Sequence, residues 1–86
     1  MDKYAALKQE IIRHGGKIGK NASAFRLLYA LAKINGISSM HHSRRYIAKS
    51  NKIKVSQVDK LAIKAINCYI VDGKFTVPSE FLFLQK

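Results

Sequence analysis

The sequence predicts a mainly α-helical domain that ends in a small β-hairpin, an α+β fold. Up to residue 67, apolar residues recur every three or four positions in successive segments, which is the spacing of one face of a helix. After residue 67, two runs rich in β-branched and aromatic residues flank Asp72–Gly73, a dipeptide that favours a two-residue hairpin turn. Because 86 residues are enough for one core only, we expect a single domain spanning residues 1–86.

The first helix is predicted at residues 2–14, followed by a basic connector up to residue 20. Its apolar face consists of Tyr4, Ala5, Leu7, Ile11 and Ile12. Gly15–Gly16 is expected to end the helix. The connector (HGGKIGK) is rich in glycine and lysine, but it lacks the spacing of a Walker phosphate loop, since Asn21 stands where a serine or threonine is needed.

The second predicted helix begins at a cap on Asn21 or Ser23 and ends at Asn35–Gly36, a typical helix stop. Most of its circumference is apolar. The remaining thin stripe, at positions i, i+4 and i+7, consists of Arg26, Ala30 and Lys33. A helix of this kind belongs in the middle of a fold, so we expect it to be the central core helix.

Two further helices are expected at residues 44–50 and 56–67, joined by a turn at residues 51–54. Ser38, Ser39 or Ser43 can cap the first of them, whose inward residues are predicted to be Tyr46, Ile47 and Ala48. Ser56 can cap the second, with Asp59 three residues later in a capping-box pattern. Its inward stripe is predicted to be Val58, Leu61, Ala62, Ala65 and Ile66.

The outward stripe of the 56–67 helix consists of hydrogen-bond donors: Gln57, Lys60, Lys64 and Asn67. Residues 44–64 hold seven lysines and arginines and one acid, a net charge of +6 out of +11 for the whole chain. Such a charge indicates a polyanionic partner, and a donor-rich helix face suits the major groove of a nucleic acid. The alternative interpretation is a set of solubilising charges on ordinary solvated helix faces.

The hairpin is predicted at residues 68–77. The alternative is that the preceding helix continues to Val71 and that Asp72–Gly73 ends it. Residues 78–86 form an apolar C-terminal segment, either a final strand or a hydrophobic tail. An exposed two-sided apolar strand must be buried or paired, so we hypothesise a homodimer through the segment's four apolar residues. These residues are Phe81, Leu82, Phe83 and Leu84.

This order of elements resembles the winged helix-turn-helix of transcription regulators, over residues 24–77, with the helix-turn-helix itself at residues 43–67. That motif places a small residue midway in its first helix and apolar residues after the turn and in the second helix. The residues at those spacings are Ile47, Ala48, Ile53, Val58 and Leu61. The turn departs from the family, which prefers glycine where this chain has Lys52; Asn51 before it tolerates left-handed backbone angles.

The resemblance implies a DNA-binding transcription regulator that docks the 56–67 helix in the major groove. It implies base contacts for Gln57 and Lys60, with Lys64 and Asn67 at the groove margin. It implies backbone contacts around the groove for the basic residues of the first helix and for Ser56, and a neighbouring groove for Lys74 at the tip of a wing. The predicted nucleic-acid-binding residues are Arg44, Arg45, Lys49, Lys52, Lys54, Ser56, Gln57, Lys60, Lys64, Asn67 and Lys74.

No catalytic site, metal site or cofactor is predicted. The three histidines and Cys68 match no zinc-ligand spacing. With five acidic residues the chain offers no acid–base set, and a ribonuclease using His41 or His42 with Arg44 or Arg45 needs a geometry that nothing in the sequence fixes. We therefore expect that the protein is not an enzyme and that Cys68 is a buried structural thiol.

Double-stranded DNA is the expected partner, and two alternatives stay open. One is an RNA-binding, ribosome-associated protein; the other is a small basic protein of viral or plasmid type that inhibits an acidic host protein. No apolar stretch is long enough to span a membrane, and residues 1–10 do not resemble a signal peptide. The single cysteine fits a reducing compartment. We expect a cytoplasmic or nucleoid-associated protein without membrane association.

Overall fold

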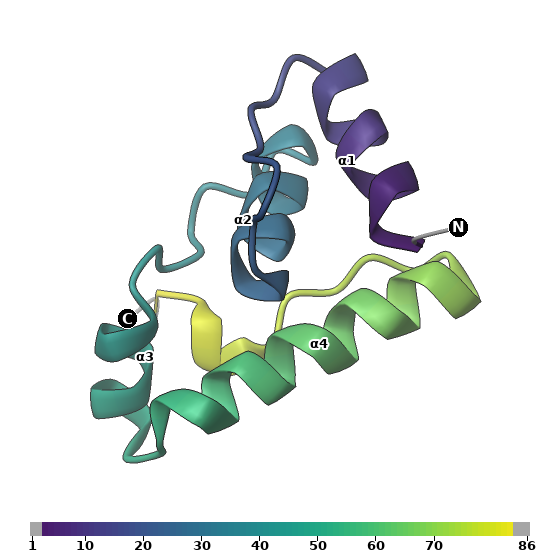
Figure 1. Ribbon diagram of the computed structural model, residues 1–86. Helices are drawn as coiled ribbons and strands as arrows, with labels where there is room; N and C mark the ends of the chain where they lie inside the picture. Colours follow the sequence, from purple (N-terminus) through teal and green to yellow (C-terminus); the bar gives the residue numbers. More distant parts are fainter. Residues whose placement is uncertain (1–2, 84–86) are drawn as a thin grey trace.

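The structure is a computed structural model that describes residues 3–83 of the chain. Its elements in order are α1 (Lys3–Arg13), α2 (Ala24–Ile34), α3 (Arg44–Asn51), α4 (Val55–Asp72) and a 3-10 turn, η1 (Ser79–Phe81). α4 runs along one side of the molecule, α2 packs across its middle, and α1 lies beside α2 on the side away from α3 (Figure 1). No helix in the described residues combines the length and hydrophobicity that crossing a bilayer requires.

α2 is the central helix, as predicted. The Ser23 hydroxyl caps it by accepting a hydrogen bond from the Arg26 amide at 3.3 Å, and Gly36, with a φ of +79°, follows its end. Its buried residues are Phe25, Leu27, Leu28, Ala30, Leu31 and Ala32. Ala30 therefore belongs to the core and not to the predicted polar stripe.

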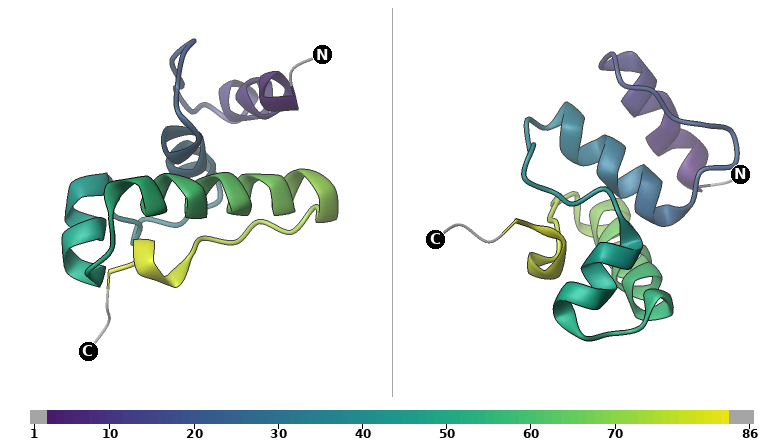
Figure 2. Two further views of the ribbon diagram at one scale, coloured as in Figure 1. Left: turned by 60° about the horizontal axis from the view of Figure 1, so that its bottom comes forward. Right: turned by 90° about the vertical axis from the view of Figure 1, so that its left-hand side faces the viewer.

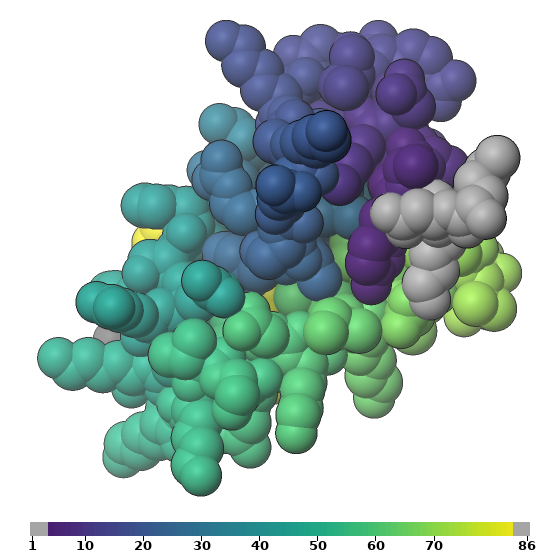
Figure 3. All heavy atoms as spheres, in the orientation of Figure 1, coloured from purple at the N-terminus to yellow at the C-terminus, as the bar shows by residue number. Residues whose placement is uncertain are grey.

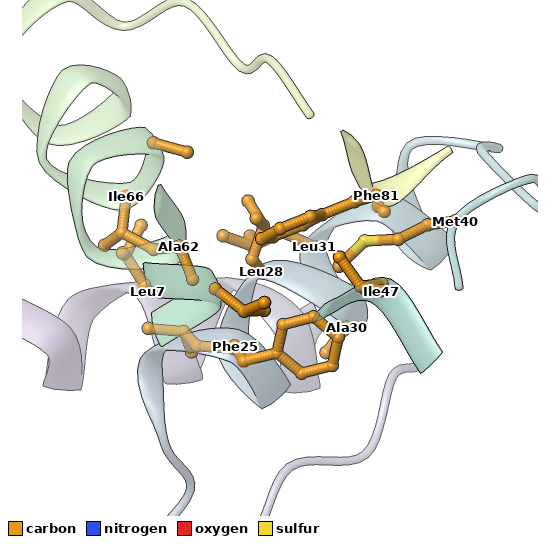
Figure 4. Close-up of a cluster of buried hydrophobic side chains, with 14 of the residues drawn as sticks. Leu7, Phe25, Leu28, Ala30, Leu31, Met40, Ile47, Ala62, Ile66 and Phe81 are labelled. Atoms are coloured by element: carbon orange, nitrogen blue, oxygen red, sulfur yellow. The ribbon is translucent and has the colours of Figure 1, made fainter. Parts of the chain in front are cut away.

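One hydrophobic core joins all the elements (Figure 4). α1 contributes Leu7 and Ile11, while Ala5 and Ile12 of its predicted apolar face are exposed. The ring of Phe81 in η1 is fully buried and meets the ring of Phe25 edge-on, with their centroids 5.3 Å apart. Burial of each large apolar side chain contributes about 1.5–3 kcal/mol, so the C-terminal turn is part of what holds this domain together.

The predicted β-hairpin at residues 68–77 is wrong, and the fold is helical. Within the described residues the β interaction is a single antiparallel bridge between Met40 and Leu82. α4 continues to Asp72 and ends at Gly73, whose φ of +71° is the left-handed conformation of a helix C-terminus. The Asp-Gly pair is thus a helix stop, which was the alternative interpretation.

Tertiary contacts explain why the helix wins over the β-rich composition. The Tyr69 hydroxyl donates a 2.8 Å hydrogen bond to the Glu10 carboxylate of α1, and Ile66 one turn earlier is fully buried. The Phe75 ring then packs against Tyr69, with centroids 5.6 Å apart, as the chain returns along α4 (Figure 2). These contacts depend on a helical backbone through residue 69, and they outweigh local β propensity.

The C-terminal segment is not the predicted extended strand. Phe81 lies in this chain's own core, so it offers no surface to a second copy. Leu82 is half-buried at the bridge to Met40, Phe83 is exposed, and Leu84 lies outside the described residues. The homodimer stays a prediction, and Phe83 is the exposed ring available to it.

Candidate nucleic-acid interface

α3 and α4 form a helix-turn-helix unit, and residues 73–83, which follow α4 in the described part of the chain, form no wing. α3 has eight residues, the turn is Lys52–Lys54, and α4 has 18 residues (Figure 2). Helices joined by a turn of three or four residues are the general form of this motif. Ile47, Ala48, Val58, Ala62, Ala65 and Ile66 are buried and Leu61 is half-buried, as predicted, whereas Tyr46, which was predicted to point inward, is 55% exposed.

The turn closes on Lys52, which adopts left-handed backbone angles of φ 57° and ψ 42°. The Ile53 amide then donates a hydrogen bond to the Ala48 carbonyl at 2.9 Å. This is the bond of a Schellman motif, a helix end that usually contains glycine. The sequence suggested Asn51 for this conformation, but Asn51 stays helical and its side-chain nitrogen donates to the Ile47 and Glu80 carbonyls. Lys52 thus occupies the position of the family's glycine, at a cost of about 1 kcal/mol.

The start of α4 differs from the prediction. Lys54 is the N-cap residue, and the Gln57 side-chain oxygen accepts a 2.9 Å bond from its amide. Ser56 is exposed and does not cap the helix, so the predicted Ser56–Asp59 capping box is wrong. This bond uses one lone pair of the Gln57 oxygen and holds the exposed side chain at the start of α4.

Asp59 instead forms an ion pair that ties the two helices together. Arg44 Nη1 lies 3.0 Å and 3.2 Å from the two Asp59 carboxylate oxygens. The two side chains are 45% and 38% exposed, so water screens the pair. The Asp59 carboxylate neutralises the charge of Arg44. Arg44 therefore links α3 to α4 and is less suited to contact a phosphate.

Two exposed groups of side chains on this unit contain most of its other basic residues. Arg45, Lys49 and Lys52 follow one another at i, i+4 and i+7, and we call them the α3 basic row. On α4, the outward positions are shared by polar and apolar side chains, which we call the α4 outer face. This face consists of Gln57, Lys60, Ile63, Lys64 and Asn67. Side chains from these two helices project from the lower part of the molecule in Figure 3.

Of the predicted site residues, most lie together on this unit. Arg45, Lys49, Lys52, Lys54, Ser56, Gln57, Lys60 and Lys64 are all exposed. Asn67 is half-buried. Lys74 is exposed but follows the far end of α4, roughly 27 Å along the helix from the turn, so its predicted role at a wing tip is wrong.

Sequence reasoning missed Ile63 as a surface residue. It is 42% exposed and lies between Lys60 and Asn67 on the α4 outer face, where a branched apolar side chain can contact a thymine methyl group. The sequence signal for its exposure is its spacing, because Ile63 stands three residues after Lys60 and four before Asn67 on the same helix face. A shallow hollow of about 480 Å³ lies along part of this face, and Cys68 is among its lining residues. Cys68 is exposed, so the prediction of a buried thiol is wrong.

The histidines lie in two places, His14 in one and His41 with His42 in the other. His14 lies at the end of α1, where its Nδ1 is 2.9 Å from the Glu10 carbonyl. His41 is buried, and burial together with the nearby charge of His42 lowers its pKa below the usual value. The described residues contain no group of three or more potential metal ligands.

Comparison of the chain with protein-family models, with curated proteins and with solved structures finds no match. Its function is therefore inferred from its own residues: a helix-turn-helix unit with a buried inner face, a basic row on α3 and a donor-rich outer face on α4.

Proposed function

We propose that the protein binds double-stranded DNA through the α3–α4 unit and acts as a transcription regulator or a general DNA-binding protein. The observation behind this proposal is the α4 outer face, where exposed ammonium and amide donors stand on a helix whose other side is buried in the core. An α-helix with side chains is about 10–12 Å wide and the major groove is about 12 Å wide, so α4 fits the groove.

The two groups of residues have different roles in this complex. Lys60 and Lys64 donate to guanine edges, and Ile63 contacts thymine methyl groups. The α3 basic row contacts phosphates through its charges. The exposed start of α4 contacts a further phosphate, because its backbone amides and the Ser56 hydroxyl favour an anion. A DNA partner also implies a cytoplasmic or nucleoid-associated location.

A protein partner is the second candidate, because the α4 outer face becomes apolar toward its C-terminus. Ile70 and Val71 are 36% and 80% exposed, and Lys64 lies about two turns before them. An acidic amphipathic helix suits such a surface, as expected for an inhibitor of an acidic protein. Binding that persists at high salt without any nucleic acid would favour this candidate.

Base preference separates the two roles and tests the proposal. Selection from a random duplex library yields a preferred site, whose affinity is compared with that of single-base variants of the site. Lys60→Ala should remove the preference at one position, a loss of about 1–3 kcal/mol there. Lys49→Ala should weaken binding to every duplex alike. Equal, sequence-independent losses for both variants would contradict docking of α4 in the groove.

A further inference from the structure

Three aromatic rings, two of them exposed and one buried, gather beside the start of α3, and we call them the aromatic cluster. The His41 ring lies between the other two, 4.5 Å from the Tyr46 ring and 3.8 Å from the Phe83 ring, centroid to centroid. Tyr46 is 55% exposed and Phe83 is 47% exposed. Rings of this size are costly to leave in water, so an exposed group of them indicates a binding surface.

The backbone holds the cluster in place. The His41 amide donates to the Phe81 carbonyl at 2.7 Å, and the Phe83 amide donates to the Ser39 carbonyl at 2.8 Å. Tyr46 stands in the first turn of α3, where its amide donates to the Ser43 hydroxyl that caps the helix. Because hydrogen bonds and a helix fix all three backbones, the rings need little ordering when a ligand arrives.

A hollow of about 340 Å³ opens beside the rings. It is lined by His41, His42, Ser43, Tyr46 and Phe83. His42 and Ser43 add polar groups to an otherwise aromatic wall, and the lowered pKa of His41 keeps its ring uncharged at neutral pH.

Cations flank the cluster on one side. Lys49 follows Tyr46 by three residues and borders it on the exposed surface of α3, and Arg45, one turn before Lys49, lies on the far side of Lys49 from the tyrosine. These two residues belong to the α3 basic row, which leads along the helix toward the turn and α4. A π surface bordered by phosphate-binding cations is the general arrangement of a single-strand binding site.

We propose that the aromatic cluster binds an unstacked nucleobase of a single-stranded DNA segment that continues from the duplex phosphates contacted by Arg45 and Lys49. This inference rests on the proposed function only for the duplex part of the ligand. With α4 in the groove and the cluster at the other side of α3, the preferred ligand is a junction between duplex and single strand.

The experiment measures fluorescence anisotropy with three DNAs that share one duplex. The first is blunt, the second has a short single-stranded overhang, and the third has an overhang of equal length made of abasic sites; both strand polarities are included. The base-bearing overhang should tighten binding about tenfold over the other two, the order of one stacked base. Tyr46→Ala should abolish this gain without changing blunt-duplex affinity, and Tyr46→Phe should keep it.

The possible failures are distinguishable. Equal affinity for the base-bearing and abasic overhangs would overturn base stacking, and blunt-duplex binding would then stand alone. Binding of the single strand without any duplex binding would overturn the proposed function and leave the cluster's role intact. Tighter binding of the matching RNA strand would overturn the assignment to DNA. A wild-type dimer that Phe83→Ala converts to a monomer would show that the rings are covered by a second copy, which also overturns the proposal.

Discussion

The two faces of α4 have separate tasks although they alternate along one stretch of sequence. Val58, Ala62 and Ile66 on the inner face have no exposed surface and pack against α2 and α3. Lys60 and Lys64 alternate with these residues in the sequence, lie one turn apart on the outer face and are exposed. The inner face therefore determines stability, and the proposed function assigns binding to the outer face. Substitutions on the two faces should change different measurements.

The largest expected effect lies on the inner face. Ile66→Ala should lower the free energy of unfolding by about 2–5 kcal/mol, because it removes a fully buried side chain and leaves a cavity. Urea denaturation followed by circular dichroism measures the loss. Lys60→Ala on the outer face is the matched control and should change stability by less than about 0.5 kcal/mol. Similar losses for both variants would remove the distinction between the faces.

Lys52 sharpens the comparison, since it is exposed yet affects stability through its backbone. Lys52→Gly should raise the free energy of unfolding by about 1 kcal/mol, because glycine adopts a φ of 57° without strain. Lys49→Gly, within the same helix, should lower it by a similar amount. Thermal denaturation compares the two variants, and a loss of stability in Lys52→Gly would show that the lysine is not strained.

The ion pair between α3 and α4 should contribute less. A double-mutant cycle of Arg44→Ala and Asp59→Ala should give a coupling free energy of about 0.2–1 kcal/mol, because both side chains are partly solvated. Added salt should reduce this coupling. A salt-independent coupling would indicate a contact other than charge attraction.

The smallest effect concerns pH. Because burial lowers the pKa of folded His41 below its usual value, the unfolded chain binds this proton more readily. Stability should be complete above about pH 6.5, should fall as the pH drops from there to the lowered pKa of the folded state, and should level off below it. His41→Phe should flatten this dependence in urea denaturation at a series of pH values. An unchanged slope in His41→Phe would assign the pH dependence to another group.

Much of the helical framework could be predicted from the sequence because it depends on local signals. Ser23 and Ser43 cap their helices, and the stop at Gly36 and the inward spacing of Ile47 and Val58 were all readable. The hairpin error arose because residues 68–77 are rich in β-formers, whereas the helix there is held by Tyr69 and its bond to Glu10, 59 residues earlier. No local pattern contains that information.

The candidate site was predicted only in part, because some of its residues are brought together by contacts between distant segments. Surface lysines at helical spacing were visible, but Tyr46 was expected inside. It lies roughly 100° around α3 from the buried Ile47, on the outward side of the helix, where its ring packs against His41, which in turn packs against Phe83. The aromatic cluster joins three distant segments, so only the folded chain reveals it. Lys52 likewise accepts left-handed angles because closure of the turn demands them.

Affinity for a blunt mixed-sequence duplex across a salt series tests the DNA-binding role of the α3–α4 unit most directly. With four phosphate contacts, from the α3 basic row and Lys54, log K should fall against log salt with a slope of about −3.6. The variant Lys60→Ala/Lys64→Ala should bind more weakly, while Lys17→Ala/Lys20→Ala, with the same loss of charge in the α1–α2 connector, should bind almost as wild type. Equal weakening by both variants, or no binding at moderate salt, would contradict the role of α4.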